Sequence, residues 1–266
     1  MRNPKEIAIN FENVAKNKAT LPLRQMVALA VFAGMYIALA GVGATVGSCT
    51  IANPSVAKLV SGCIFSAGLM MVVIAGAELF TGNNLMSIAL IRRQISVLSL
   101  LRNWVVVYLG NAVGGIAVAA MIVYGHTPGI IDSKLSASIV GIATAKAGLS
   151  FGDAFLRGVL CNFLVCVAVW MTASSKKVSG KIACIFMPIM LFVMCGYEHC
   201  VANLYYLPAG LFTASEYGIA AKSLTIAGCL HNIAAVTLGN IVGGAVFVGL
   251  GYWLALYPSL HPVQQK

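Results

Sequence analysis

Charged side chains are scarce in this chain. Of its 266 residues, 7 are acidic and 17 are basic, so that 9% are charged while 60% are apolar. Soluble globular domains usually have about a quarter of their residues charged. Several apolar stretches are as long as the ~20 residues that an α-helix needs to cross a ~30 Å hydrocarbon core. The composition therefore excludes a soluble domain and predicts an integral membrane protein.

Motifs for metals, haem and nucleotides are also missing. The eight cysteines lie almost entirely within apolar segments, and none forms a Cys-x-x-Cys pair with the spacing of a zinc site. No histidine pair is spaced for haem, and no glycine-rich nucleotide loop occurs. We therefore expect no cofactor, no metal and no enzymatic activity.

Six apolar stretches can span a membrane. We place them at about residues 26–48, 58–90, 101–124, 154–174, 182–213 and 223–256. The second and the fifth are too long for one straight helix, and each contains a polar break. Residues 21–257 are thus predicted to form one all-α transmembrane domain of six helices, two of them broken, followed by a tail over residues 258–266.

Basic residues are concentrated on one side of these spans. Twelve would lie on the side of the two termini and five on the other, which predicts cytoplasmic termini by the positive-inside rule. Residues 1–20 are predicted to form an amphipathic helix on that face, because Ile7, Phe11, Val14 and Ala15 share one helical stripe. The basic residues flank spans and form no patch, so we expect no binding of nucleic acid.

The two halves of the chain repeat each other. Gly-Ala-Glu-Leu-Phe-Thr-Gly-Asn at 76–83 is followed 120 residues later by Gly-Tyr-Glu-His-Cys-Val-Ala-Asn at 196–203. Leu-Gly-Asn-Ala-Val-Gly-Gly at 109–115 recurs as Leu-Gly-Asn-Ile-Val-Gly-Gly at 238–244. Repeated halves that each contain a broken helix are typical of transporters, with the substrate site near the bilayer midplane. An inverted repeat and a transport function are therefore predicted.

Each break carries a carboxylate at a depth where membrane helices are normally apolar. A charge there costs ~2.5–3.5 kcal/mol or more, so we expect Glu78 to be bound by backbone amides or hydroxyls of the irregular stretch 80–84. Glu198 occupies the same place in the second break, beside His199. A histidine gains and loses its proton near neutrality, which suits a relay.

Two half-helices should begin at the breaks, near Gly82 and Val201, and point toward the membrane centre. Helix N-termini carry unpaired amides and about half a positive charge. This arrangement favours a small anion over a cation. The alternative interpretation is a neutral-solute pore of the aquaporin type, although the Asn-Pro-Ala motifs expected of such a pore are absent.

These motifs resemble those of the formate/nitrite transporter family, whose members move formate, nitrite, hydrosulfide and similar small anions. The resemblance runs from about Lys18 to Leu256 and includes Cys-Asn-Phe-Leu-Val-Cys-Val-Ala-Val-Trp at 161–170 and His-Asn-x4-Val-Thr-Leu-Gly-Asn at 231–240. It implies an aquaporin-like protomer with its own pore, assembled as a homopentamer in the inner membrane of a prokaryote. Its partners would then be the anion, the lipid bilayer and further copies of the chain.

The resemblance also implies roles for individual residues. The central histidine would be His199, with Thr81 and Asn162 as its polar neighbours and Lys146 as the basic residue of the outer vestibule. Glu198, Asn203 and Asn232 are further candidates along the pathway. The expected apolar constriction or gate consists of Phe65, Leu69, Leu79, Phe80, Val165 and Phe192. Where the family often has serine after the histidine, this chain has Cys200.

Two mechanisms remain open at this point. In the first, His199 gives a proton to the anion, so that a neutral acid crosses the apolar rings. In the second, the anion crosses as such, and the histidine supplies only charge or a hydrogen bond. The physiological anion among nitrite, formate and hydrosulfide also stays open, although several motifs look closer to the nitrite-type members.

Overall fold

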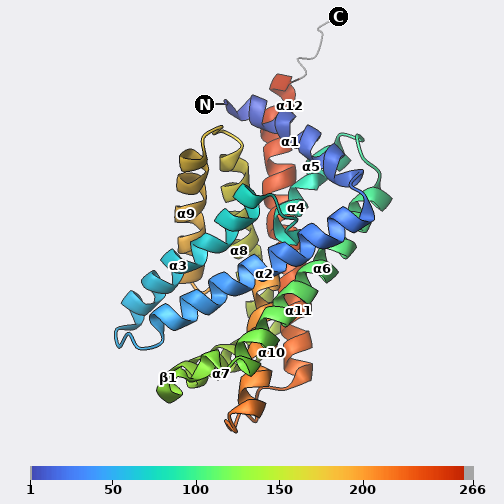
Figure 1. Cartoon of the computed structure of the whole chain (residues 1–266). Helices are drawn as coiled ribbons and strands as arrows, with labels where there is room; N and C mark the ends of the chain where they lie inside the picture. The colour runs from blue at the N-terminus through green and yellow to red at the C-terminus, as the bar shows by residue number, and fades with distance from the viewer. Residues whose placement is uncertain (1, 261–266) are drawn as a thin grey trace, which may run out of the picture.

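The structure is a computed structural model that describes residues 2–260, and in this part of the chain it is built from helices. The first half contains α1 (Pro4–Ala19), α2 (Leu23–Ser48), α3 (Pro54–Ala75), α4 (Phe80–Asn83), η1 (Asn84–Met86), α5 (Ser87–Ile91) and α6 (Val97–Tyr124). The second contains η2 (Thr127–Gly129), the two-residue β1 (Ile130–Ile131), α7 (Asp132–Ala147), α8 (Phe151–Thr172), α9 (Val178–Met194), α10 (Cys200–Glu216), α11 (Ile226–Ile241), the π-helix η3 (Val242–Leu250) and α12 (Gly251–Leu260). Figure 1 shows these elements side by side as an elongated bundle.

The expected all-α membrane fold is confirmed. Among the described residues, five helices are long and apolar enough to cross a membrane: α2, α3, α6, α8 and the continuous run from Ile226 to Leu256. The sixth span is α9, which has 17 residues and is continued by α10 after the second break. The predicted tail over 258–266 is only partly covered, because 261–266 lie outside the described residues and α12 ends at Leu260.

Both breaks begin at a glycine. Gly76 ends α3 with φ +84°, and Gly196 follows α9 with φ +68°. Side chains with a Cβ rarely adopt this left-handed conformation, so each glycine lets the chain leave its helix in an extended form. The next half-helices, α4 and α10, begin at Phe80 and Cys200, within two residues of the predicted starts.

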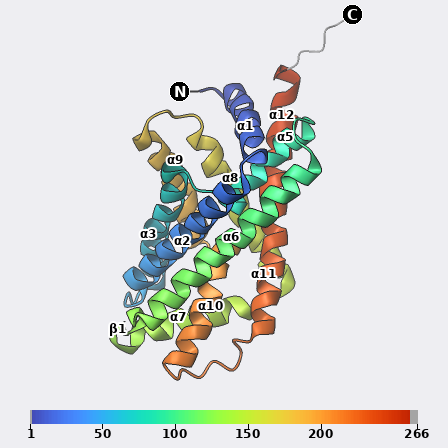
Figure 2. The ribbon, with the colours of Figure 1, turned by 45° about the vertical axis from the view of Figure 1, so that its right-hand side comes forward.

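The repeat includes one helix that the sequence analysis did not predict. Helix α7 covers residues 132–147, and α1 covers residues 4–19, an offset of 128 at both ends. In Figures 1 and 2, α1 lies at one end of the bundle beside α12, and α7 lies at the opposite end. Equivalent helices at opposite ends show that the two halves are inverted relative to each other.

The apolar face of α1 is turned toward the protein. The ring of Phe11 stacks on Trp170 with centroids 5.2 Å apart, and Trp170 stacks on Tyr252 at 4.3 Å. Glu12 accepts a hydrogen bond from Gln94 Nε2 at 2.7 Å and lies 3.4 Å from Arg92 Nε. The apolar stripe that predicted an amphipathic helix therefore packs on α8 and α12, and Glu12 ties the helix to the loop after α5.

The repeated glycines bring the long helices into close contact. A Cβ on Gly114 of α6 would lie 2.1 Å from the carbonyl oxygen of Val31 in α2. A Cβ on Gly243 would lie equally close to the carbonyl oxygen of Val159 in α8. No side chain fits at such distances, so these glycines fix how closely the helices pack around the breaks. This explains the recurrence of the motif after 129 residues.

Candidate functional site

Three cavities lie in series along the bundle. The first vestibule (about 560 Å³) is lined by the first break together with α1, and the second vestibule (about 290 Å³) by the second break together with α7. A chamber of only about 10 Å³ separates them. It shares Leu69 and Leu79 with the first vestibule, and Phe65, Phe192 and His199 with the second. The narrowest part of the pathway therefore lies between these two sets of side chains.

The chamber is apolar except for one imidazole. Its lining consists of Ile37, Phe65, Leu69, Leu79, Val165, Ile189, Phe192 and His199. Five of the predicted constriction residues lie here, and the rings of Phe65 and Phe192 meet edge to face with centroids 5.7 Å apart. Ile37 and Ile189 were missed, although the repeat offsets of 128 and 120 relate them to Val165 and Leu69 and could have found them.

Phe80 is placed elsewhere. Its ring packs edge to face on Tyr108 at 4.9 Å and on Trp104 at 6.0 Å. Its backbone N–H donates to Asn111 Oδ1 at 3.0 Å, which turns the residue toward α6. In this conformation Leu79, and not Phe80, closes the first vestibule toward the chamber.

His199 joins the two breaks. It is the N-cap residue of α10, and its Nδ1 accepts the backbone N–H of Ala202 at 3.0 Å. Its Nε2 lies 3.0 Å from Thr81 Oγ1 in α4. Because Nδ1 is an acceptor, the neutral ring carries its proton on Nε2 and donates it to Thr81. The predicted Thr81–His199 contact is therefore present.

Asn162 supports the Thr81 side of this contact without touching the imidazole. Its Nδ2 donates to the carbonyl oxygen of Thr81 at 3.3 Å, to Asn84 Oδ1 at 3.0 Å and to the carbonyl oxygen of Asn240 at 2.7 Å. Cys166 Sγ also lies 3.3 Å from the Thr81 carbonyl. The side chain thus ties α4 to α8 and α11 and fixes where the Thr81 hydroxyl meets the ring.

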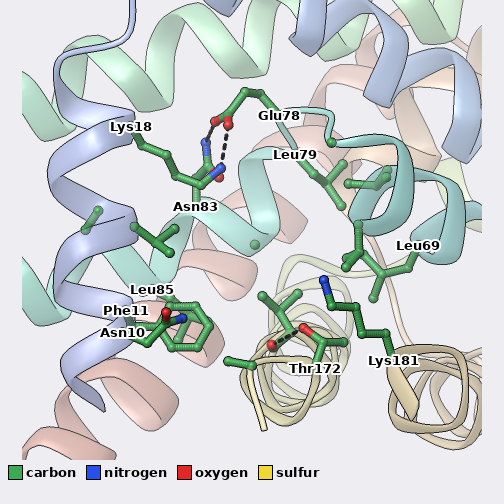
Figure 3. Close-up of a pocket in the computed structure, with 18 of the residues that line it drawn as sticks. Asn10, Phe11, Lys18, Leu69, Glu78, Leu79, Asn83, Leu85, Thr172 and Lys181 are labelled. Carbon is green, nitrogen blue, oxygen red and sulfur yellow. Dashed lines mark hydrogen bonds and ion pairs between the residues drawn. The ribbon is translucent and has the colours of Figure 1, made fainter. Parts of the chain in front are cut away.

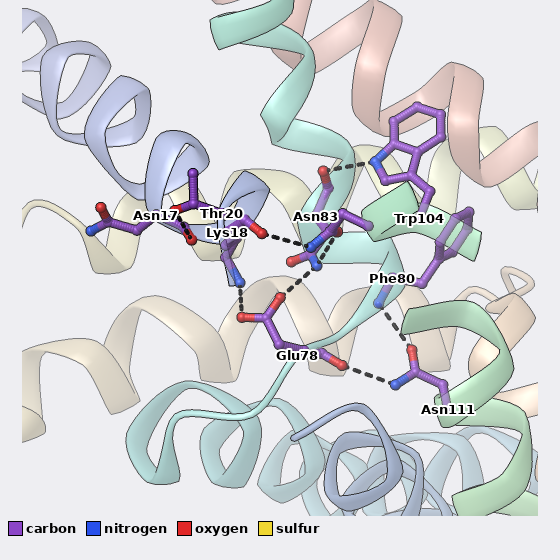
Figure 4. Close-up of polar contacts among 9 residues, drawn as sticks. Asn17, Lys18, Thr20, Glu78, Phe80, Asn83, Trp104 and Asn111 are labelled. Carbon is purple, nitrogen blue, oxygen red and sulfur yellow. Dashed lines mark hydrogen bonds and ion pairs between the residues drawn. The ribbon is translucent and has the colours of Figure 1, made fainter. Parts of the chain in front are cut away.

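The carboxylate of the first break is held by a lysine and an asparagine. Glu78 Oε1 lies 2.5 Å from Lys18 Nζ, and its Oε2 accepts a hydrogen bond from Asn83 Nδ2 at 2.7 Å. Asn83 Nδ2 also donates to Asn103 Oδ1 at 2.8 Å. Figures 3 and 4 show Lys18 reaching from α1 to this carboxylate. The expected partners were backbone amides or hydroxyls of the stretch 80–84, whereas the carboxylate is held by the side-chain amide of Asn83 from that stretch and by Lys18, which was not predicted.

The second break repeats this arrangement. Lys146 Nζ lies 2.9 Å from Glu198 Oε1, and Asn203 Nδ2 donates to Glu198 Oε2 at 2.7 Å and to Asn232 Oδ1 at 2.7 Å. Asn232 Nδ2 in turn donates to the carbonyl oxygen of Lys146 at 2.8 Å. The predicted residues Lys146, Glu198, Asn203 and Asn232 therefore form one cluster at the edge of the second vestibule.

Two further asparagines replace the helical hydrogen bonds that the breaks remove. Asn111 accepts from the Phe80 N–H and donates to the carbonyl oxygen of Glu78 at 2.9 Å. Asn240 accepts from the N–H of Cys200 at 2.9 Å and donates to the carbonyl oxygen of Glu198 at 3.0 Å. Unpaired backbone groups are costly in an apolar interior. Neither asparagine was a predicted site residue, although both belong to the repeated Leu-Gly-Asn motif.

The described residues contain no group of three histidine, cysteine or acidic side chains that could hold a metal ion. The polar groups at the chamber are the imidazole, which lines it, and the Thr81 hydroxyl, which is bound to that imidazole. These groups can bind and orient a small solute and can hold a proton at one position.

Known proteins resemble this chain over nearly its whole length. The sequence profile of the formate/nitrite transporter family matches residues 5–254. The chain is 39% identical to the formate channel FocA of Haemophilus influenzae, covering 93% of this chain and 92% of that protein. It is 36% identical to the nitrite transporter NirC of Escherichia coli, over 97% and 93% of the two chains.

A solved pentameric formate channel with formate bound has a TM-score of 0.78 and 34% identity, and the match covers 88% of this chain and 98% of that one. This likeness, the family profile and the two transport proteins all indicate the same family. The protein is a multi-pass membrane protein of the formate/nitrite transporter family.

Proposed function

We propose that the protein conducts the small monovalent anions of weak acids, such as formate, nitrite or hydrosulfide, through one pore in each protomer. The observation that carries this proposal is the arrangement of two basic vestibules in series, separated by a small apolar chamber with a single imidazole. The relatives named for formate and nitrite support the substrate class. The pentameric formate channel supports assembly of this chain as a homopentamer.

The chamber sets the main barrier. A solute that passes Leu79 and Phe192 loses its water, and an unpaired charge in such a surrounding is heavily penalised. An ion that is small enough to fit is therefore still blocked by the cost of losing its water. A weak acid can avoid the penalty by taking a proton, which distinguishes it from chloride or nitrate. Selection in the proposed mechanism is by basicity as well as by size.

His199 is proposed to exchange this proton. The N–H of Ala202 occupies Nδ1 at rest, so a second proton must displace a helix cap worth about 0.5–2 kcal/mol. A buried imidazolium also needs an opposite charge nearby. The arriving anion supplies that charge, so that proton and anion occupy the chamber together. This coupling predicts symport, because neither charge is stable in the chamber without the other.

The lysine–glutamate clusters are proposed to hold the breaks. Lys146 lines the second vestibule, yet Glu198 compensates its charge at 2.9 Å. The pair therefore adds little net field for attracting an anion. Its hydrogen bonds through Asn203 and Asn232 fix the start of α10, and with it the imidazole.

The loop Leu79 to Asn84, within the first break, is proposed to gate the pore from the first vestibule. Helix α1 contacts this break through Lys18. If the termini are cytoplasmic, as the charge distribution predicts, the first vestibule faces the cytoplasm. A change of pH on that side then acts on the gate through α1, whose Lys18 binds Glu78.

Flux into proteoliposomes tests the proposed function. Purified protein is reconstituted with a trapped pH dye, and formate, nitrite and hydrosulfide are added at an acidic and at a neutral pH, with nitrate and glycerol as controls. We expect saturable uptake of at least one weak-acid anion with movement of protons, and little passage of nitrate or glycerol. Glycerol flux without anion flux would instead support a neutral-solute pore.

A further inference from the structure

The first vestibule contains more positive charge than its carboxylate can neutralise. Its lining includes Arg2, Lys18, Lys176 and Lys181 against the single carboxylate of Glu78. Both oxygens of that carboxylate are occupied, one by Lys18 and the other by Asn83. Arg2 donates to the carbonyl oxygen of Ala173 at 3.0 Å. Three positive charges in this lining therefore have no carboxylate to neutralise them, and of these Arg2 is held at a carbonyl oxygen, which leaves Lys176 and Lys181 to be considered.

These two lysines differ in position. Lys176 is exposed in the loop before α9, whereas Lys181 is half-buried on the first turns of α9. Figure 3 shows the Lys181 amine directed into the cavity, on the side where Leu69 and Leu79 lie. Leu69 and Leu79 also border the chamber. The amine is thus placed just in front of the first constriction.

The Lys181 amine has donors to spare. It forms no ion pair with the carboxylates of the described residues, whose pairs involve Lys18, Arg92 and Lys146. The nearby hydroxyl of Thr172 donates to the carbonyl oxygen of Val169 at 2.6 Å. A half-buried ammonium group with three N–H donors is best satisfied by an anion.

Lys181 has no basic counterpart in the first half of the repeat. The position equivalent to Lys181 is Ser61, 120 residues earlier, which lines the second vestibule. The unpaired cations of the second vestibule, Lys58 and Arg157, are both exposed. The two approaches to the chamber are therefore chemically different at matching positions.

We propose that Lys181 forms an anion-binding position in the first vestibule, from which a small monovalent anion passes Leu69 and Leu79 into the chamber. This inference rests on the proposed function and assigns it a specific residue. The position binds the ionised form of the substrate, which then meets the proton at His199. It also makes the two faces of the protein unequal, with tighter binding from the face that carries the N-terminus.

Formate flux in vesicles of both orientations tests this position. Lys181→Met and Lys181→Gln remove the charge, Lys181→Arg keeps it, and Lys176→Met is the matched control at the exposed rim. Half-saturating formate concentrations are measured from each face at low and at high ionic strength, with oligomer size checked by gel filtration. Two neutral substitutions are used so that one remains informative if the other fails to assemble.

From the N-terminal face, Lys181→Met or Lys181→Gln should raise the half-saturating concentration roughly ten-fold, as expected for one lost hydrogen bond to a charged partner. The increase should persist at high salt, because a half-buried pair is screened weakly. Lys181→Arg should stay near wild type, and Lys176→Met should show a small effect that salt abolishes. Unchanged half-saturation in both neutral variants, or equal changes from both faces, would overturn the inference, while retained anion uptake would leave the proposed function standing.

Discussion

Replacing His199 with asparagine separates the structural role of this residue from its proposed role in proton exchange. Asparagine is among the best N-cap residues, and its Oδ1 can accept the N–H of Ala202 that Nδ1 now accepts at 3.0 Å. The amide cannot take up a proton at ordinary pH. Phenylalanine, the second variant, removes both the cap and the proton.

The magnitudes follow from the contacts that each variant loses. His199→Asn loses the 3.0 Å contact with Thr81, worth about 0.5–1.5 kcal/mol. His199→Phe loses the cap as well, a further cost of about 0.5–2 kcal/mol. For transport the loss is larger, because a bare anion in the chamber costs several kcal/mol. Since about 1.4 kcal/mol changes a rate ten-fold, uptake at acidic pH should fall at least about ten-fold in both variants.

The assay is formate uptake in proteoliposomes at an acidic and at a neutral pH, combined with thermal unfolding of the purified oligomer. Wild type should take up formate faster at acidic pH. His199→Asn should lose this acceleration while its midpoint of unfolding stays close to that of wild type. An asparagine variant with an unchanged pH profile would refute the relay, because the proton would then have to reach the anion in the vestibule.

Three other predictions concern the constrictions, the buried ion pairs and α1. Leu79→Ala or Phe192→Ala should increase flux and weaken selectivity, measured as the ratio of formate to nitrate uptake; unchanged flux in both would place the narrowest point elsewhere. Glu198→Gln should destabilise the oligomer by up to about 3–5 kcal/mol, since it leaves Lys146 without its partner, and adding Lys146→Met should recover part of the loss in a denaturation assay. If the double variant is no more stable than the single one, the two side chains are not coupled. Deleting residues 1–18 removes the contact between Lys18 and Glu78 and should shift the pH profile of flux, whereas an identical pH profile would exclude α1 from gating.

The spans and the breaks could be predicted from sequence because their signals are local. Apolar runs of sufficient length show the spans, and a glycine followed by a carboxylate shows where each run must be interrupted. Helix α7 has no such signal, since its 16 residues include Asp132, Ser133, Lys134 and Lys146 among the apolar ones. Only the offset of 128 from α1 indicates it. A repeat search that includes the weakly apolar segments would have found it.

The partners of the buried carboxylates were harder to foresee. Lys18 precedes Glu78 by 60 residues and belongs to a helix whose apolar stripe suggested contact with lipid. The placement of that helix on the protein depends on aromatic stacking with α8 and α12, which are distant in sequence. Composition and periodicity carry no information about such pairings. The repeat does carry this information. Lys18 and Lys146 occupy equivalent positions, and a lysine that recurs together with a recurring carboxylate indicates that the two form a pair in each half.

The repeat distinguishes the residues that hold the two breaks in position from the residues proposed to act on the substrate. The lysine, the glutamate and the three asparagines of each half hold a break in position, and they occur twice because there are two breaks. The polar groups at the chamber occur once: the repeat places Leu79 opposite His199 and Val201 opposite Thr81. Asn162 corresponds to Gly34, where even a Cβ would lie 2.1 Å from the carbonyl oxygen of Asn111. The proposed proton site, made of one imidazole and one hydroxyl, therefore required departures from symmetry, and the residues that break the repeat are the ones to test first for transport.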